Sequence, residues 1–324
     1  MAPAQAPRAP TIATPTIPAD DHVVIFRTLK SRVRGRLVRL GAAADGILTP
    51  HGIPDVASAA LGEAAALTAL LGSALPDGSR MILQTRTDGV VSFLISDCDW
   101  QGHLRGYARY DAETLHVLRE SGEKLDIGSV LGDGHLAITI EQGPDGERYQ
   151  GVMALEGAPL ATAAAAYFEQ RESLPTYVRL AVAQHFQAAN GGAAARRQWR
   201  AGGLMIQDET HGRASAGDDD ERDGWLRVRI LAATIEDHEL LDPELTSERL
   251  LLRLFHEEGV LVERVAPLSA TCRCARERVL DMLKSFGTDD LSGMRDEAGR
   301  ISVSCEFCTA RYVFATSEIG EPQG

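Results

Sequence analysis

Two short stretches, Cys272-Arg273-Cys274 and Cys305-Glu306-Phe307-Cys308, hold four of the five cysteines of this chain. In an extended segment, residues i and i+2 face the same way, so both sulfurs of the first stretch can reach one ion. In the second stretch, a tight turn over two residues can aim both sulfurs at one metal. Two such half-sites supply the tetrahedral set of four thiolates that zinc favours. The sequence therefore predicts a C-terminal zinc module with Cys272, Cys274, Cys305 and Cys308 as ligands.

The spacing and surroundings of the two pairs are compatible with a purely structural zinc site and with a redox switch. Thirty residues, 275–304, separate the pairs, which is longer than in a plain zinc ribbon and leaves room for a helix. A thiolate that binds zinc is also the species that oxidises, so the thiols can instead form two short-range disulfides. A disulfide within Cys272-Arg273-Cys274 would close a small strained ring, and strained disulfides are the labile kind. Cationic neighbours also favour the thiolate: Arg273, Arg276 and Arg278.

Composition and charge argue against several classes of protein. The chain has 324 residues, enough for more than one domain, and a net charge of −13 that disfavours binding to a phosphate backbone. It has no run of 18 apolar residues, so we expect no membrane span. Residues 1–21 are rich in Ala, Pro and Thr and lack the apolar region of a signal peptide, which predicts a disordered tail. Reduced thiols without an export signal predict a cytoplasmic protein.

Residues 22–208 predict an α+β core, a mixed domain with an antiparallel sheet rather than a doubly wound one. Alternating or β-rich stretches predict strands at 22–26, 33–40, 81–87, 90–95, 103–110, 135–140, 149–155 and 203–207. Helices are predicted at 56–75, 161–170 and 178–187. The turn Thr87-Asp88-Gly89 predicts a hairpin in which the glycine takes a positive φ. Cys98 stands alone in a strand-like stretch, which predicts a core or strand-end residue without a redox role.

A change of composition at residue 209 marks the start of an acidic segment. Residues 209–266 hold 15 acidic and 7 basic residues, and the stretch 217–221 is too polar to pack. Apolar residues at helical spacing predict amphipathic helices over 225–241 and 247–257. We therefore expect a helical linker over 209–266, the zinc module over 267–316 and a tail over 317–324. The acidic charge has two interpretations: solvated helix faces, or a segment of marginal stability that self-repulsion helps to detach.

The sequence holds no catalytic or nucleotide-binding motif. It contains no G-x-G-x-x-G after a strand, no G-x-x-x-x-G-K-[ST], no H-E-x-x-H and no G-x-S-x-G. His256-Glu257-Glu258 places an imidazole beside two carboxylates, but we interpret it as a solvated side chain that suits the end of a helix. Glu147-Arg148-Tyr149-Gln150-Gly151 offers no nucleophile paired with a base. We expect a protein that is not an enzyme.

The C-terminal arrangement resembles the heat-shock protein 33 family of redox-regulated chaperones. The matching stretches are 271–278, 305–308, 312–314, 147–152, 155–157, 167–176, 202–205 and 253–258. The resemblance extends from about residue 22 to 316, and the C-x-C pair followed by a C-x-x-C pair is specific to it. One departure is Thr309, where the family commonly has Gly or a similar turn former.

The resemblance implies an ATP-independent holdase that is inactive while four thiolates bind one zinc per chain. Peroxide or hypochlorite would form the Cys272–Cys274 and Cys305–Cys308 disulfides, with loss of zinc and unfolding of the linker. The active form would be a homodimer that holds unfolded client proteins. Two other hypotheses compete with this one: a zinc-ribbon interaction protein whose metal is only structural, and an enzyme with an appended zinc module.

Overall fold

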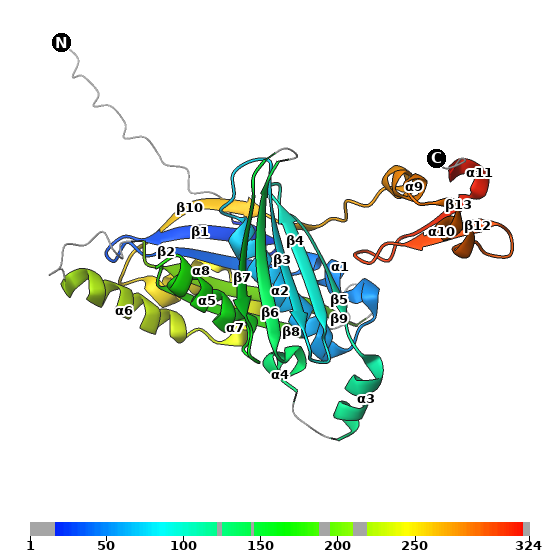
Figure 1. Ribbon diagram of the computed structural model, residues 1–324. Helices are drawn as coiled ribbons and strands as arrows, with labels where there is room; N and C mark the ends of the chain where they lie inside the picture. The colour runs from blue at the N-terminus through cyan, green and yellow to red at the C-terminus, as the bar shows by residue number, and fades with distance from the viewer. Residues whose placement is uncertain (1–16, 122–124, 144–145, 188–194, 210–218, 320–324) are drawn as a thin grey trace, which may run out of the picture.

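The computed structural model describes residues 17–121, 125–143, 146–187, 195–209 and 219–319. These residues form two β-sheets, helices that pack between and around them, and a small C-terminal module (Figure 1). The predicted α+β class is confirmed. Residues 1–16 and 320–324 of the predicted tails, and residues 217–218 of the polar stretch, lie outside the described residues.

The first sheet has five antiparallel strands in the order β10-β1-β2-β9-β8. The strands are β1 (His22–Thr28), β2 (Arg34–Leu40), β8 (Thr176–Gln187), β9 (Arg196–Gln207) and β10 (Val260–Pro267). One face packs on the main core, and the other face is covered by helices from later in the chain. Both faces are therefore apolar, which explains why β1 and β2 are buried almost without interruption.

The second sheet has the order β11-β5-β4-β3-β6-β7. Its strands are β3 (Ser79–Thr87), β4 (Phe93–Asp99), β5 (His103–Arg109), β6 (Gly134–Gln142), β7 (Arg148–Ala154) and β11 (Ser269–Ala270). Only the β11–β5 pairing is parallel. Other helices flank the two sheets: α1 (Ala42–Leu48), the 3₁₀ turn η1 (Thr49–His51), α3 (Ala112–Glu120), α4 (Ile127–Leu131) and α5 (Leu160–Arg171).

Helix α2 (Asp55–Gly72) packs between the two sheets and contacts strands of both. It is apolar on nearly all sides, as a helix enclosed by sheets must be. By length and composition alone it could cross a membrane, but 78% of that window is buried inside the protein. A Cβ on Gly62 would lie 2.8 Å from Val182, so the glycine allows the close approach of α2 to β8.

The predicted helix at 178–187 is wrong, because this segment belongs to strand β8. It pairs with β9 along its whole length, from Thr176 opposite Gln207 to Gln187 opposite Arg196. Pairing and burial outweigh the helix propensity of its Ala and Gln residues. The predicted helical linker also ends early, since β10 within it pairs with β1.

The hairpin predicted at residues 87–89 is present, but the role assigned to its glycine is wrong. Gly89 is absent from the glycines with positive φ. A Cβ there would lie 2.3 Å from the carbonyl oxygen of Leu131. The turn therefore needs glycine for the close approach of another backbone segment, not for a left-handed conformation.

Three helices between β9 and β10 cover the outer face of the five-stranded sheet: α6 (Asp219–Ala233), α7 (Asp237–Leu241) and α8 (Ser247–Phe255) (Figure 1). Helix α8 buries its apolar side, and the ring centroid of Phe255 lies 5.7 Å from that of Phe26 on β1. Each large apolar side chain buried in this way contributes about 1.5–3 kcal/mol. Within the described ranges, the apolar cluster that holds these helices includes no residue of the C-terminal module.

Two buried arginines fasten the turn between α7 and α8, and we call them the arginine clamp: Arg39 and Arg200. Arg39 is fully buried on β2 and donates hydrogen bonds to the carbonyls of Asp242 and Leu245. Arg200 on β9 donates from Nε to the carbonyl of Leu241 at 2.6 Å. Carbonyls at and beyond the end of a helix lack the usual helical partners, and the clamp donates to three of them here; the Asp242 carbonyl also accepts from the Leu245 N–H at 3.3 Å. Asp20 pairs with both arginines, which places residue 20 of the predicted tail against the core.

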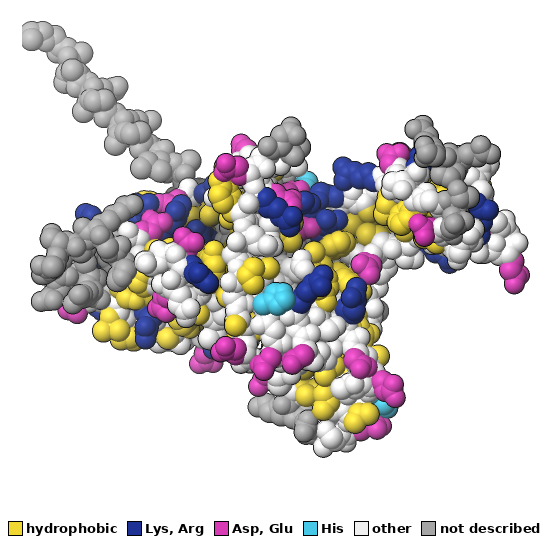
Figure 2. Space-filling model, in the orientation of Figure 1, with side chains coloured by type: hydrophobic (Ala, Val, Ile, Leu, Met, Phe, Trp, Pro, Cys, Tyr) yellow, Lys and Arg dark blue, Asp and Glu magenta, His cyan; other side chains and the backbone are white. Residues whose placement is uncertain are grey.

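The C-terminal module projects from the core as a separate lobe (Figure 2). It contains α9 (Arg276–Lys284), α10 (Thr288–Gly293), β12 (Arg300–Ser304), β13 (Arg311–Ala315) and α11 (Thr316–Ile319). Its buried apolar cluster consists of Leu283, Leu291, Ile301, Phe314 and Ile319. A core of this size rarely holds a fold by itself, and small domains of this kind usually need a metal or disulfides.

Candidate metal centre

The first cysteine pair follows directly from the short strand β11. Ser269 and Ala270 pair in parallel with His103 and Leu104 of β5, and the backbone N–H of Thr271 donates to the Leu104 carbonyl at 3.1 Å. The chain is thus drawn out along the sheet edge just before Cys272. Alternation along an extended chain then turns residues 272 and 274 to one side.

The second pair lies in the turn of the β12–β13 hairpin. The Cys305 N–H donates to the Ala310 carbonyl at 2.9 Å, and the Thr309 N–H donates to the Cys305 carbonyl at 2.8 Å. Thr309 adopts a φ of +60°, in the left-handed region that glycine occupies without strain. A turn conformation that favours glycine therefore forms here with threonine, at some conformational cost.

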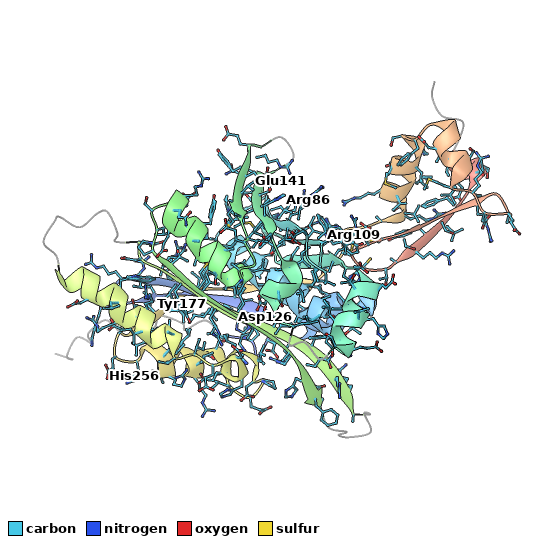
Figure 3. The ribbon with its side chains drawn as sticks, turned by 60° about the horizontal axis from the view of Figure 1, so that its bottom comes forward. Arg86, Arg109, Asp126, Glu141, Tyr177 and His256 are labelled. Carbon is cyan, nitrogen blue, oxygen red and sulfur yellow. The ribbon has the colours of Figure 1, made fainter. Side chains whose placement is uncertain are left out.

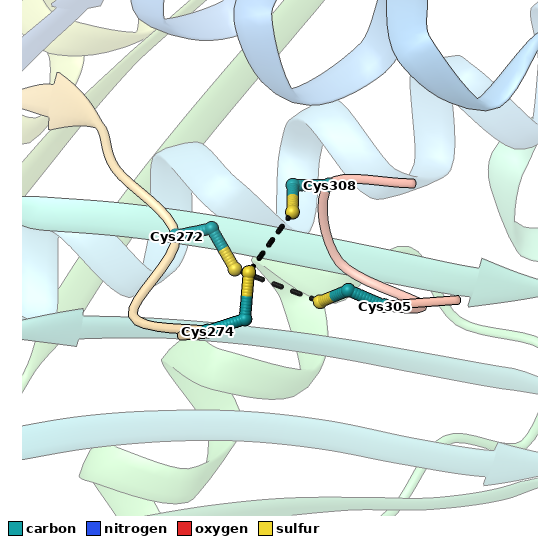
Figure 4. A group of neighbouring side chains, drawn as sticks. All are labelled: Cys272, Cys274, Cys305 and Cys308. Carbon is teal, nitrogen blue, oxygen red and sulfur yellow. Dashed lines mark hydrogen bonds between the residues drawn. The ribbon is translucent and has the colours of Figure 1, made fainter. Parts of the chain in front are cut away.

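The structure brings the four predicted ligands together (Figure 4). All four sulfurs lie within 4.8 Å of one another. Cys272 Sγ lies 3.7 Å from Cys305 Sγ, and Cys274 Sγ lies 3.3 Å from Cys308 Sγ. A tetrahedral site with Zn–S bonds of about 2.3 Å has sulfurs about 3.8 Å apart. The cluster is therefore close to the size and shape needed to hold a metal ion.

The four thiols of the cluster influence one another's ionisation. Burial disfavours the Cys272 thiolate, but hydrogen bonds from the Cys274 N–H and the neighbouring thiols outweigh it and lower the pKa of Cys272 to about 7. Burial raises the pKa of both Cys305 and Cys308. For Cys308, hydrogen bonds with the neighbouring sulfurs raise it further. One thiolate thus suppresses the next. A bound cation would reverse this and favour four thiolates.

Sequence reasoning missed the residues that surround the cluster. The Tyr312 hydroxyl on β13 donates to Cys274 Sγ at 3.2 Å, and this hydrogen bond raises the pKa of Tyr312 to about 12. On the core side, Arg105 of β5 lies with its guanidinium 4.0 Å from the ring centroid of Phe307. Tyr312 lies in one of the stretches that resemble the family, 312–314, but nothing in the sequence indicated that it lies beside the cysteines. Arg105 is about 200 residues away in sequence, so no local pattern could place it.

The other candidate residues lie elsewhere. The side chain of His256 is 62% exposed at the end of α8, at the edge of the molecule opposite the module (Figure 3). Glu258 is buried and paired with Arg227 at 2.9 Å, so this carboxylate is structural, whereas the side chain of Glu257 is 78% exposed. Gln150 of β7 donates to Thr139 on the neighbouring strand, and Gly151 gives room to the ring of Tyr167.

Cys98 is buried on β4 and is a free thiol, as are the other four cysteines. Burial and then the nearby Asp99 and Asp97 raise the pKa of Cys98 to about 12. A thiol of this kind has almost no thiolate near neutral pH and is therefore unreactive. The predicted position of Cys98 as a core residue at the end of a strand is confirmed.

The sequence and the fold both match known proteins. The family profile described as "Hsp33 protein" matches residues 21–315. A "33 kDa chaperonin" of Caulobacter vibrioides is 42% identical and covers 93% of this chain and 97% of its own length. One of Pseudomonas putida is 33% identical, with 94% of both chains covered. The crystal structure of a 33 kDa chaperonin from Thermotoga maritima superposes with a TM-score of 0.72 at 22% identity, covering 92% of this chain and 96% of that one. This chain belongs to the Hsp33 family of chaperones.

Proposed function

We propose that this chain is a redox-regulated holdase that works without ATP, acts in the cytoplasm and has no enzymatic activity. The observation that supports this most strongly is the cluster of four sulfurs from two half-sites, in a module whose described residues form a buried apolar cluster of five side chains. The fold of such a module depends on whether its thiols bind a metal or form disulfides. Their chemistry is thereby linked to the folded state of the segment around them.

In the reduced state, Cys272, Cys274, Cys305 and Cys308 would hold one Zn²⁺ per chain. The all-sulfur donor set suits zinc, and the spacing of the sulfurs fits it. Bound zinc would supply a cross-link between the β11 end and the β12–β13 turn. The chain's own contribution is to present the sulfurs together, with the Tyr312 hydroxyl donating to one of them.

Oxidation would convert each pair of cysteines into a disulfide. In each pair, two thiols give up two electrons and two protons to one H₂O₂, an S–S bond forms, and the peroxide leaves as two molecules of water. Four thiolate ligands are lost when both pairs have reacted. In the reduced cluster Cys272 lies 3.7 Å from Cys305 and Cys274 lies 3.3 Å from Cys308, sulfur to sulfur, so proximity alone does not select the partner within a pair. The expected pairing, Cys272 with Cys274 and Cys305 with Cys308, rests on the short chain between partners once the cluster has opened.

The consequence for the rest of the chain would be release of the linker helices from the five-stranded sheet. The face beneath them consists of apolar side chains, among them Val24, Phe26, Leu37, Leu204 and Ile206. Unfolded client proteins expose similar apolar segments, so the freed face and the freed helices would both suit them. A homodimer of the oxidised form would double this surface.

A structural-zinc interaction protein is the alternative, in which the thiols bind metal but do not switch. Zinc content, free thiols and suppression of client aggregation, measured together before and after peroxide, separate the two. We expect one zinc per reduced chain, its release with loss of four thiols, and holdase activity without ATP only after oxidation. Holdase activity that is the same before and after oxidation would contradict the switch.

A further inference from the structure

Two of the three residues enclosed by the cysteine pairs, Arg273 and Phe307, contact the core, whereas Glu306 is exposed. Alternation turns Arg273 away from the sulfurs on either side of it. Its guanidinium forms ion pairs with two carboxylates of β4: Asp97, and Asp99 at 3.1 Å. The Arg273 side chain is 20% exposed and that of Asp97 only 2%, so this contact is largely shielded from solvent.

The second pair repeats the arrangement. Phe307 lies between Cys305 and Cys308, and the Arg105 guanidinium stacks on its ring. His51 Nε2 lies 3.1 Å from the Phe307 carbonyl oxygen, within hydrogen-bond distance. A cation over an aromatic face is attractive, more so when partly removed from water.

Asp97 joins the two halves of this contact. It accepts a hydrogen bond from Arg105 Nε at 2.8 Å and also pairs with Arg273. The path Arg273–Asp97–Arg105–Phe307 therefore connects one half-site to the other through the core, in parallel with the sulfur cluster itself. A buried carboxylate with two arginine partners is costly to break, because each group loses its partner in a poorly hydrated place.

We propose that Arg273 and Phe307 form a docking surface for the β4–β5 edge of the core, and that this docking holds the sulfur cluster closed. The inference rests on the proposed function of the cluster. It adds which contact determines how readily the closed cluster opens and releases zinc. A contact made only when the cluster is closed stabilises the closed form by its own free energy. A Cys272–Cys274 disulfide draws its sulfurs to about 2.05 Å apart and constrains the backbone of Arg273 between them. Oxidation of that pair and undocking from the core then favour each other.

The test uses full-length, reduced, zinc-loaded protein and follows zinc transfer to a coloured chelator, with and without peroxide. Asp97→Asn is nearly isosteric and lies outside the module. We expect it to release zinc about tenfold faster, which corresponds to about 1.4 kcal/mol. Glu141→Gln is the matched control, since Glu141 pairs with Arg80 on the same sheet and not with the module. The control should release zinc at the wild-type rate.

A double-mutant cycle with Arg273→Gln tests whether the contact itself matters. The effects of the two changes should be clearly less than additive, because both remove the Arg273–Asp97 pair, while each also removes one contact of its own, with Asp99 or with Arg105. If Asp97→Asn does not fold, as judged by the thermal unfolding of the core, Phe307→Leu replaces it, since it keeps an apolar side chain and removes only the ring beneath Arg105.

Zinc release at the wild-type rate from Asp97→Asn and from Phe307→Leu would overturn the proposal. Fully additive effects of Asp97→Asn and Arg273→Gln would also overturn it. Zinc transfer is independent of client binding. A failure of the holdase proposal would appear instead as oxidised wild-type protein that does not prevent aggregation.

Discussion

The linker helices and the C-terminal module are held to the same core in opposite ways. Helices α6–α8 lie on an apolar cluster that extends across a whole sheet face, and the arginine clamp fastens their turn. The module has five buried apolar residues of its own and contacts the core mainly through ion pairs and one stacked ring. The module is therefore sensitive to the chemistry of its thiols, whereas the linker is stable until something disturbs the sheet beneath it.

The largest effect should follow removal of the metal from the reduced protein. Zinc binding provides on the order of 10 kcal/mol to modules of this kind, comparable to the gross contribution of about 1.5–3 kcal/mol from each of five buried side chains, which the conformational entropy cost of folding offsets. We expect hydrogen exchange in β12, β13 and α9 to lose essentially all protection after chelation, while β2 and β9 retain theirs. A module that stays protected without metal would show that its apolar core is sufficient to keep it folded.

Unfolding of the linker helices should follow unfolding of the module. Strand β10 is the segment that would connect the two events. This strand connects α8 to the module and pairs with β1 at the sheet edge. We expect oxidation to remove exchange protection from residues 219–267 together, helices and β10 alike, while the core keeps its protection. If the helices lose protection while β10 keeps it, unfolding of the module does not reach the helices through detachment of this strand. A linker that stays as protected as the core while client binding begins would reject linker unfolding altogether.

A single side chain can test how firmly the linker is anchored. Phe255→Ala should weaken docking by about 3–5 kcal/mol, because it removes a fully buried ring from between α8 and β1. The reduced variant should then expose apolar surface and suppress aggregation without oxidant. Leu252→Ala on the same helix is the control, since Leu252 is 62% exposed and its loss should change stability by no more than about 0.5 kcal/mol. Equal behaviour of the two variants would contradict the role of the buried face.

The linker side of the core also contains a pH-sensitive group. Burial, and then the negative charge of Asp237 on α7, raise the pKa of Glu63 on α2 to about 7. The folded state therefore binds a proton that the unfolded state releases near its usual value of about 4.5, so stability falls as pH rises between these values and levels off above 7. Glu63→Gln should remove this slope and stabilise the protein above pH 7, by up to a few kcal/mol. Parallel unfolding curves of both proteins from pH 5 to 8 would contradict the assignment.

The smallest expected change lies in the module turn. Thr309→Gly should relieve the left-handed strain and stabilise the closed cluster by about 1 kcal/mol. Zinc retention against a chelator should rise accordingly. Thr309→Ala keeps the strain and should not share the gain. A glycine variant that retains zinc no better than wild type would show that the turn is unstrained in solution.

The cysteine cluster could be predicted because each pair is local and its spacing has few geometric solutions. Most strands of the core were also predictable, since their alternating patterns are complete within a few residues. Strand β8 was not, because its Ala and Gln residues favour a helix and only pairing with β9 makes it a strand. The contact between Arg273 and Asp97 joins residues 176 positions apart, and nothing near either one indicates the other.

The position of β9 has a kinetic consequence for any client held on the sheet face. This strand lies between β2 and β8, so the helices that follow it stay attached to the sheet even when they are released. Their return is then an intramolecular reaction, with an effective concentration in the millimolar range for a flexible tether. A client competes as a separate molecule at far lower concentration. Once the cysteines are reduced again, re-covering of the face should displace clients at a rate independent of protein concentration.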